Sequence, residues 1–199
     1  MVWRLSAACA LIDGAALANG DQTLLGNIGI TDNGGCGAPV IRFTRVAGEG
    51  HFMFGGAGGW IINQTFVVGG AGWGAVDDLE TTYQPSPQEP TLTRTVSFGY
   101  GGFFLEYVGL SHQVVHFTIS ALVGAGGLGF HDPMGVYDRA GDGFFAMEPG
   151  AGVELNVVKF FRVNVGGSYR LTKGALFAGV DDADLRGPSA AIAFKFGSF

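Results

Sequence analysis

Residues 112–127 alternate between apolar and polar side chains with a period of two. The apolar positions are Val115, Phe117, Ile119, Ala121 and Val123, and the polar positions between them are His116, Thr118 and Ser120. A period of two is typical of a β-strand whose two faces meet different surroundings. The pattern predicts a strand here but does not say which face is the inner one.

Seven further stretches have the same extended character. The eight predicted strands are 38–46, 50–59, 64–75, 95–108, 112–127, 143–157, 160–171 and 187–198. Residues 47–49, 60–63, 109–111 and 158–159 are tight turns, whereas 76–94, 128–142 and 172–186 are long and rich in Pro, Asp and Gly. From the second turn onward, short and long connections alternate. An up-and-down antiparallel meander with all long loops at one end produces this order, as in outer-membrane barrels.

The amino-acid composition indicates that the polar faces of the predicted strands point into the barrel. Charged residues make up only 14% of the 199 residues, against roughly a quarter in ordinary soluble domains. The polar faces are sparse and otherwise filled by Gly, Ser and Ala, which suits a narrow lumen, and the strands are long enough to cross a bilayer. We therefore predict an all-β fold, an eight-stranded up-and-down antiparallel transmembrane β-barrel with an N-terminal extension. A soluble lipocalin-like barrel that binds an apolar ligand remains the alternative.

Aromatic residues gather near both predicted strand ends, as expected where strands cross two membrane interfaces. The predicted interface aromatics are Trp60, Tyr107, Phe160, Phe161 and Phe199 at the short-turn end, and Trp73 and Tyr100 at the long-loop end.

The N-terminal region divides from the barrel by composition. Residues 1–20 form a candidate signal peptide, ending in an Ala-Leu-Ala sequence, or a retained N-terminal segment. Residues 21–37 form an extension, and residues 38–199 form the barrel domain. A disulfide between Cys9 and Cys36 requires that residues 1–18 are retained in an oxidising compartment.

Several spaced segments, among them GYGGFFLEYV, VVHFTISALVGAGGLGF and EPGAGVELNVVKFFRVNVGGSYR, resemble small outer-membrane β-barrel proteins of Gram-negative bacteria, in the size class of OmpA and OmpX. The resemblance covers about residues 22–199. It implies an outer-membrane location, with outer-membrane lipid and the barrel assembly machinery as partners. Two features depart from the family. Phe199 is out of phase with the alternation before it, and Pro149 lies mid-strand, where a bulge at residues 148–150 would accommodate it.

The charged residues on the polar faces predict a network across the lumen. Its members are Arg42, Glu106, His116, Glu148, Glu154, Arg162, Arg170 and Lys195. Because buried charges are costly unless paired, each acid should find a base. An eight-stranded barrel is just wide enough for side chains to fill it. We therefore favour a sealed structural plug over a proton or ion path.

Other chemistry has weaker support in the sequence. No Ser-His-Asp spacing or nucleophile elbow stands out, although His116 with Glu148 or Glu154, or the His131-Asp132 pair, would suit a lipid-modifying or hydrolytic enzyme at the rim. No metal or cofactor motif is found, and a net charge of −6 argues against nucleic acid. Gly-rich outer faces at 55–59, 69–74 and 99–102 would allow self-assembly into an array, tube or filament. We predict a non-enzymatic outer-membrane barrel with a structural or surface-interaction role, and self-assembly as its closest alternative.

Overall fold

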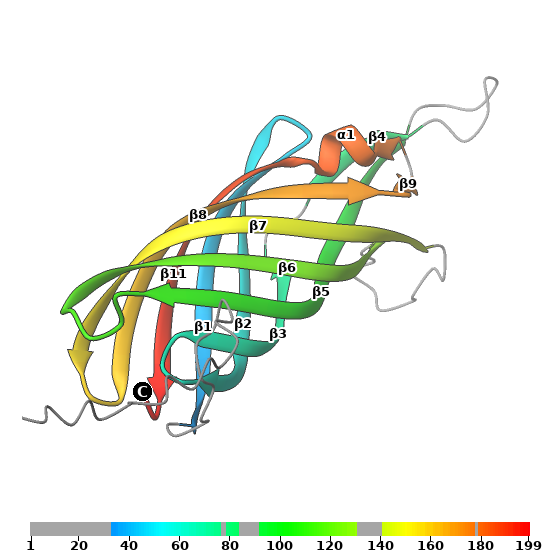
Figure 1. The fold of residues 1–199 in the computed structure, drawn as a ribbon. Coiled ribbons are helices and arrows are strands. Elements are labelled where there is room, and N and C mark those ends of the chain that lie inside the picture. Colours follow the sequence, from blue (N-terminus) through cyan, green and yellow to red (C-terminus); the bar gives the residue numbers. More distant parts are fainter. Residues whose placement is uncertain (1–32, 77–78, 84–91, 131–140, 178) are drawn as a thin grey trace, which may run out of the picture.

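The computed structural model describes residues 33–76, 79–83, 92–130, 141–177 and 179–199. Eight long strands form a closed antiparallel barrel (Figure 1). These strands are β1 (Asn33–Val46), β2 (Glu49–Ile62), β3 (Phe66–Ala75), β5 (Leu92–Gly109), β6 (Val115–Phe130), β7 (Gly141–Val158), β8 (Phe161–Lys173) and β11 (Gly187–Gly197). The shorter elements are β4 (Leu79–Tyr83), β9 (Leu176–Phe177), β10 (Val180–Asp181) and α1 (Asp182–Leu185). Among the described residues, no helix has the length and apolar character needed to cross a membrane.

The strands follow the predicted up-and-down order. Neighbours in the sheet run β3-β2-β1-β11-β8-β7-β6-β5, and pairing of β3 with β5 closes the ring. The first and last long strands are also neighbours, because β1 pairs with β11 along most of its length. β4 pairs with the far end of β5 and extends a hairpin beyond β3 at the long-loop end. The predicted fold class is confirmed.

The N-terminal boundary of the barrel sheet differs from the predicted one. β1 begins at Asn33 and pairs with β2 from there, so residues 33–37 belong to the barrel sheet and not to the extension. The candidate signal peptide and Cys9 lie outside the described residues.

The connection at 172–186, expected to be a loop, contains β9, β10 and α1. The short helix forms because Asp181 caps it: its carboxylate accepts the N–H groups of Ala183 and Asp184, and the Asp184 carboxylate accepts the N–H of Asp181. This reciprocal arrangement is a capping box built from acids, and it satisfies N–H groups that a helix start leaves unpaired.

The predicted bulge at Pro149 is wrong. On the β8 side, Met147 pairs with Leu171 and Gly150 with Ser168, so the register is unchanged across the proline. The pairings of Glu148 and Pro149 with β8 are interrupted instead, because proline has no N–H to donate to a ladder. The register shift of β7 lies between Asn156 and Val158, beside the turn.

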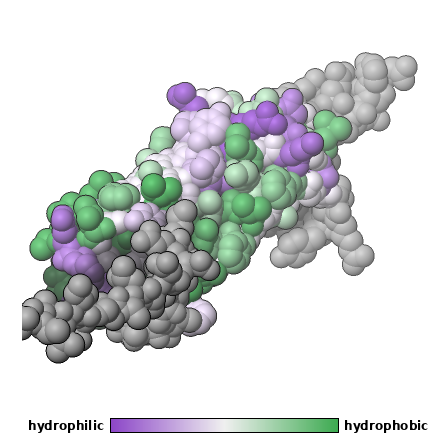
Figure 2. All heavy atoms as spheres, in the orientation of Figure 1, coloured by the Kyte–Doolittle hydropathy of each residue, from purple (hydrophilic) through white to green (hydrophobic). Residues whose placement is uncertain are grey.

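Side chains alternate between a charged interior and an apolar exterior. The opening strand is representative: His116 and Thr118 are 3% exposed, whereas Val115 is 53% and Ile119 54% exposed. The exterior carries exposed apolar side chains from every long strand except β3, including Phe43, Phe54, Phe103, Phe117, Val153, Val165 and Ile192. Figure 2 shows hydrophobic residues along the visible side of the barrel, with hydrophilic residues near the end that carries α1 and a smaller group towards the opposite end. The orientation predicted for His116 and Thr118 is therefore confirmed.

Candidate functional site

The lumen near the short-turn end holds a cluster centred on Glu154 of β7, called here the inner cluster. Glu154 is 1% exposed. Its Oε1 lies 3.2 Å from Arg162 Nη1 of β8 and 3.1 Å from His116 Nε2 of β6. Its Oε2 accepts a hydrogen bond from Lys195 Nζ of β11, which also donates to Glu106 Oε1 of β5 at 2.5 Å. Five strands thus contribute one charged or titratable side chain each to a single connected network.

The inner cluster is sealed towards the short turns by aromatic and aliphatic residues. The Phe199 ring lies 3.9 Å from the Arg162 guanidinium carbon, a cation–π contact. The same ring packs against a small apolar group formed by Ile61, Val67 and Val108. Asn156 Nδ2 donates to the carbonyl of Gln113 at 2.8 Å and so fixes the neighbouring turn to the barrel wall.

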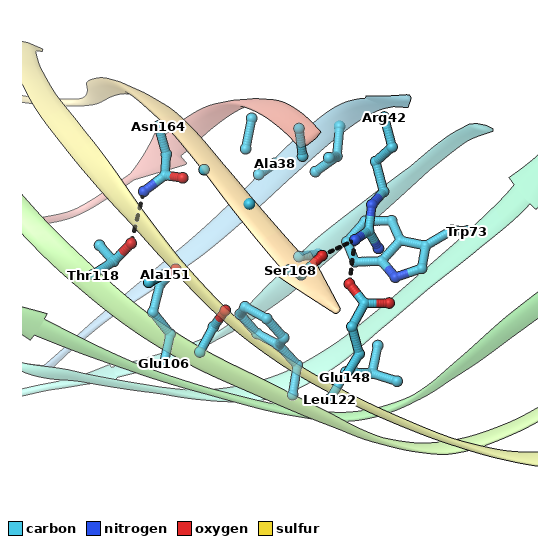
Figure 3. A pocket seen from close by; sticks show the side chains of 18 of the residues that line it. Ala38, Arg42, Trp73, Glu106, Thr118, Leu122, Glu148, Ala151, Asn164 and Ser168 are labelled. Carbon is cyan, nitrogen blue, oxygen red and sulfur yellow. Dashed lines mark hydrogen bonds and ion pairs between the residues drawn. The ribbon is translucent and has the colours of Figure 1, made fainter. Parts of the chain in front are cut away.

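A second cluster, the outer cluster, lies towards the long-loop end around Arg42 of β1 (Figure 3). Arg42 Nη2 forms an ion pair with Glu148 of β7 and donates to Ser168 Oγ at 2.5 Å. Its Nη1 donates to the Tyr100 hydroxyl at 3.3 Å, and that hydroxyl donates to the other carboxylate oxygen of Glu148. The guanidinium carbon also lies 4.6 Å from the centre of the Trp73 ring.

Arg170, also in the outer cluster, binds neutral acceptors. It is completely buried, and its guanidinium donates to Leu185 O at 2.5 Å, Thr44 Oγ1 at 3.1 Å and Arg45 O at 3.1 Å. It also lies over the rings of Phe98 and Tyr100. The expectation that acids and bases pair therefore holds for the three lumen glutamates, whereas Arg170 is stabilised by carbonyls, a hydroxyl and aromatic rings.

The contact to Leu185 ties the 174–186 connection to the barrel. Leu185, Val180 and Ala175 pack into the main core cluster, and Ala47 N–H donates to Asp184 O at 2.8 Å. Thr172 Oγ1 donates to Asp182 O at 2.9 Å. We call this segment the outer cap, because it covers the long-loop end of the lumen.

Between the two clusters lies a chamber of about 90 Å³. Its polar lining includes Thr118, Ser120, Asn164 and Ser168, and Figure 3 shows Asn164 and Thr118 joined by a hydrogen bond, 2.9 Å long. Small side chains such as Ala38 form much of the remaining wall. One water needs roughly 10–15 Å³ of such space, so the chamber has room for several waters but not for a drug-sized ligand.

Four of the seven predicted interface aromatics lie outside and three lie inside. Trp60, Tyr107 and Phe160 are strongly exposed, and Phe161 stacks on the exposed Phe196. By contrast, Trp73 is 8% and Tyr100 5% exposed, and Phe199 closes the inner cluster. The interface assignment of Trp73, Tyr100 and Phe199 is wrong, because it used distance from the strand end and ignored the alternation. Tyr100 is an even number of residues from Glu106, which places both on the lumen face.

The alternation could also have added Ser168 and Asn164 to the predicted lumen residues, since they share the face of Arg162 and Arg170 on β8. Other predicted residues lie elsewhere. Cys36 lies on β1 and lines the inner end of the lumen, while Cys9 and the His131-Asp132 pair lie outside the described residues. In the part of the chain that the structure describes, no group of three or more His, Cys, Asp or Glu side chains is arranged to hold a metal ion.

The chain is similar to known proteins in structure, whereas comparison of its sequence finds no match. No protein-family model matches the chain, and no curated protein matches its sequence. Among solved structures, Neisserial surface protein A (NspA) matches with a TM-score of 0.53 at 11% identity, over 83% of this chain and 96% of that one. The attachment invasion locus protein Ail of Yersinia pestis, solved with the heparin analogue sucrose octasulfate, matches with a TM-score of 0.50 at 13% identity. That match covers 83% of this chain and 97% of Ail.

The chain has the fold of the small eight-stranded outer-membrane barrels. The resemblance predicted from its sequence segments is thereby confirmed at the level of fold. Both matches cover nearly the whole of the other chain, so the described barrel corresponds to a complete barrel of this type.

Proposed function

We propose that this chain is a non-enzymatic barrel of the bacterial outer membrane, with a sealed lumen and a structural or surface-interaction role. The observation that carries the proposal is the reversal of its two faces. Large apolar side chains such as Phe103 (56% exposed) and Phe54 (55%) point outward, while Glu154 (1%) and Arg170 (0%) are buried. A soluble barrel would expose this apolar surface to water, at roughly 25 cal/mol per Å², whereas lipid accommodates it.

The sealed lumen is supported by closure at both ends. The inner cluster and Phe199 fill the short-turn end, and the outer cluster lies beneath the outer cap. The chamber between them is small, about 90 Å³. This arrangement favours a structural plug over an open solute path, since ions would have to pass both buried clusters.

A surface role is supported by strands that continue past the membrane. β5 and β7 have 18 residues each, whereas about 9–11 tilted residues cross a bilayer. The β4–β5 hairpin extends the long-loop end further. The heparin analogue bound by Ail is strongly anionic, and our chain has a net charge of −6 and acidic residues on its outer cap. We therefore expect a partner other than a sulfated polysaccharide.

The rim-enzyme alternative has less support. His116 is buried in the inner cluster, and its ring nitrogens lie within hydrogen-bonding distance of Glu154 and the Gln113 carbonyl. An acid–base pair at this depth lies away from any surface-bound substrate. Among the described residues, the His116–Glu154 pair therefore fits the plug better than catalysis.

Two measurements on the membrane-extracted protein test the proposal. On a denaturing gel, a closed barrel should migrate differently before and after boiling. In planar bilayers, the same protein should give no steady conductance steps. Recovery of the chain in the aqueous fraction would contradict the membrane location, and stable ion conductance by the heat-modifiable form would contradict the sealed lumen.

Self-assembly is a second candidate, favoured by one observation about the glycines. Those that point into the lumen are required by close strand contact: a Cβ on Gly55 or Gly69 would lie 2.0 Å from a backbone oxygen of the neighbouring strand. Outward-facing Gly72 and Gly74 of β3 are different. A Cβ on Gly72 would meet its nearest atom at 3.6 Å, and one on Gly74 would meet nothing within 4 Å. Barrel packing therefore does not account for the flat outer face of β3.

Sedimentation in detergent distinguishes this candidate. If barrels associate through β3, the wild type should sediment as an oligomer and the Gly72→Leu/Gly74→Leu variant as a monomer. Val165→Phe provides a matched control, since Val165 is exposed on β8, diametrically opposite β3 in the strand order. A wild type that sediments as a monomer would contradict self-assembly through the outer face of β3. The same would follow if the Val165→Phe control dissociated as much as the glycine variant.

A further inference from the structure

The turns at the short-turn end of the barrel carry exposed apolar side chains. Leu110 and Val114, in the β5–β6 turn, are 59% and 67% exposed, and Phe160, in the β7–β8 turn, is 63% exposed. Val158, at the end of β7, is 47% exposed. Turns are usually built from Gly, Asn, Asp, Ser and Pro, so this apolar surface is unusual for its position. We call these four residues the inner rim patch.

Leu110 shows that turn geometry does not account for the patch. Its backbone φ is +61°, in the left-handed region that favours Gly and Asn over residues with bulky side chains. The Gln113 N–H donates to the Leu110 carbonyl at 2.9 Å and closes the turn. The turn therefore holds a leucine where glycine or asparagine would suit the backbone better, and it presents that side chain outward.

Backbone hydrogen bonds connect the patch to the start of β1. The Val114 carbonyl accepts the N–H of Asn156 at 2.8 Å, which joins the β5–β6 turn to β7. The Phe160 carbonyl accepts the N–H of Gly197 in β11 at 3.0 Å, and the next residue donates to Gly35 O of β1 at 3.1 Å. In Figure 1 the start of β1 and the end of β11 lie at the same end of the barrel as these turns. The chain that precedes β1 therefore enters the barrel beside the inner rim patch.

That preceding chain has a composition that matches the patch. Residues 21–32 read DQTLLGNIGITD and include four large apolar residues, which are Leu24, Leu25, Ile28 and Ile30. Their charged residues are two aspartates, at positions 21 and 32, and Lys159, exposed between Val158 and Phe160 on the rim, has the opposite charge. The segment thus offers both apolar contact and charge complementarity.

We infer that residues 21–32 of this chain bind along the inner rim patch. Adjacent strands are about 4.8 Å apart, so β6, four strands from β1 in the barrel order, lies about 19 Å away along the sheet. An extended chain spans about 3.3 Å per residue, so the nine residues from Asn33 back to Leu24 reach about 30 Å. Covalent attachment at the rim also gives the segment a higher effective concentration than a separate partner would have. The contact does not require lipid, so it is independent of the proposed membrane location.

Photo-cross-linking of the full-length protein in membranes identifies the occupant directly. The cross-linking residue p-benzoylphenylalanine replaces Phe160 or Val114 in the patch. It replaces Leu176 in a matched control, because Leu176 is 79% exposed but lies at the long-loop end. Mass spectrometry after irradiation should find cross-links to residues 21–32 from both patch positions and none from position 176. Cross-links only to lipid, to a second copy or to another protein would overturn the inference.

A second measurement tests whether the apolar residues of the segment hold it in place. Maleimide labelling of Phe160→Cys is followed in detergent micelles, with Cys9 and Cys36 replaced by serine in every protein. The Ile28→Ser/Ile30→Ser variant should be labelled about tenfold faster, because loss of buried apolar area shifts the segment away from the rim by at least that factor. Thr31→Ser, a change in the same segment that removes no large apolar side chain, should leave the rate unchanged.

The two proposals fail in different ways. Equal labelling rates in all three proteins, or equal acceleration by Thr31→Ser, would overturn the rim contact while the boiling-dependent gel shift still reports a closed barrel. Absence of that shift in the wild type would contradict the proposed barrel instead.

Discussion

The two charged clusters of the lumen stabilise their buried charges through different kinds of partner. In the inner cluster, Glu154 is shared by Lys195, Arg162 and His116, and Lys195 is shared in turn by Glu106. In the outer cluster, the Arg42–Glu148 pair is supported by a phenol and a hydroxyl. Arg170 has carbonyl, hydroxyl and aromatic partners there.

The difference matters because a buried charge is costly once its partner is lost. Glu154 is the shared acceptor of Lys195, Arg162 and His116, so its loss leaves Arg162 without a carboxylate partner and leaves Lys195 with Glu106 alone. The partners of Arg42 are more varied, and many of them survive the loss of Glu148. We therefore expect the inner cluster to control the stability of the whole barrel, and the outer cluster to control mainly the outer cap.

The largest effect is expected for Glu154→Gln. The substitution keeps the shape but leaves Lys195 and Arg162 without their shared carboxylate, and breaking a buried pair costs about 3–5 kcal/mol. Urea unfolding of the barrel in lipid vesicles, followed by tryptophan fluorescence, measures the free energy of unfolding. The Glu154→Gln/Arg162→Met double variant should recover part of the loss. Wild-type stability in Glu154→Gln would contradict the central role of this residue.

Glu148→Gln should be milder, by about 2 kcal/mol, the value of a hydrogen bond to a charged group. Arg42 keeps its bonds to Ser168 and Tyr100 and its contact with Trp73. The same unfolding experiment compares the two glutamine variants directly. A loss equal to or greater than that of Glu154→Gln would remove the proposed distinction between the clusters.

Arg170→Met should change the global free energy of unfolding by only about 1 kcal/mol. The variant loses hydrogen bonds to a charged group, worth about 1.5–3 kcal/mol each, but it also removes the cost of burying a guanidinium that has no carboxylate partner. The bond to the Leu185 carbonyl is lost, however. We expect faster amide hydrogen exchange in α1 and β10, with exchange in β7 unchanged. Uniform acceleration across the barrel would mean that Arg170 supports the whole fold.

The smallest effect concerns pH and the outer cap. The Ala175 N–H, followed by that of Gly174, lowers the pKa of Asp182 below its ordinary value, with help from Arg186 and Lys173. A lowered pKa in the folded state stabilises the cap above the unfolded pKa of about 3.9, and this stabilisation is lost as pH falls through the folded pKa. The protection of the Gly174 and Ala175 amides, measured as their exchange rate relative to the intrinsic rate at the same pH, should therefore fall below about pH 4, and Asp182→Asn should abolish that dependence.

The alternation of side chains was sufficient to predict the strands, their up-and-down order and the lumen face of His116, Thr118, Glu154 and Lys195. Alternation is a local property and survives without knowledge of neighbours. It does not say which acid meets which base, because strand tilt and stagger decide which residues lie at one height of a barrel. That Lys195 joins Glu106 to Glu154 required the structure.

Predictions from local sequence pattern were wrong where contacts between residues distant in the sequence determine the structure. The 174–186 segment reads as a polar loop, yet Leu185 is completely buried and anchors the cap. Trp73 is surrounded by glycines on β3, so no polar neighbour marked its face as the inner one. Pro149 was expected to force a bulge, but the sheet tolerates it by interrupting two pairings with β8.

The most direct test of the reversed faces compares two tryptophans. Trp60 is 50% exposed on the outside and Trp73 is 8% exposed in the lumen. Variants that retain only one of them, with the other and Trp3 replaced by phenylalanine, are reconstituted in vesicles of acyl-chain-brominated lipid, and fluorescence quenching is measured. We predict strong quenching of Trp60 and weak quenching of Trp73. Stronger quenching of Trp73, or no quenching of either, would contradict a barrel that turns its apolar face to lipid.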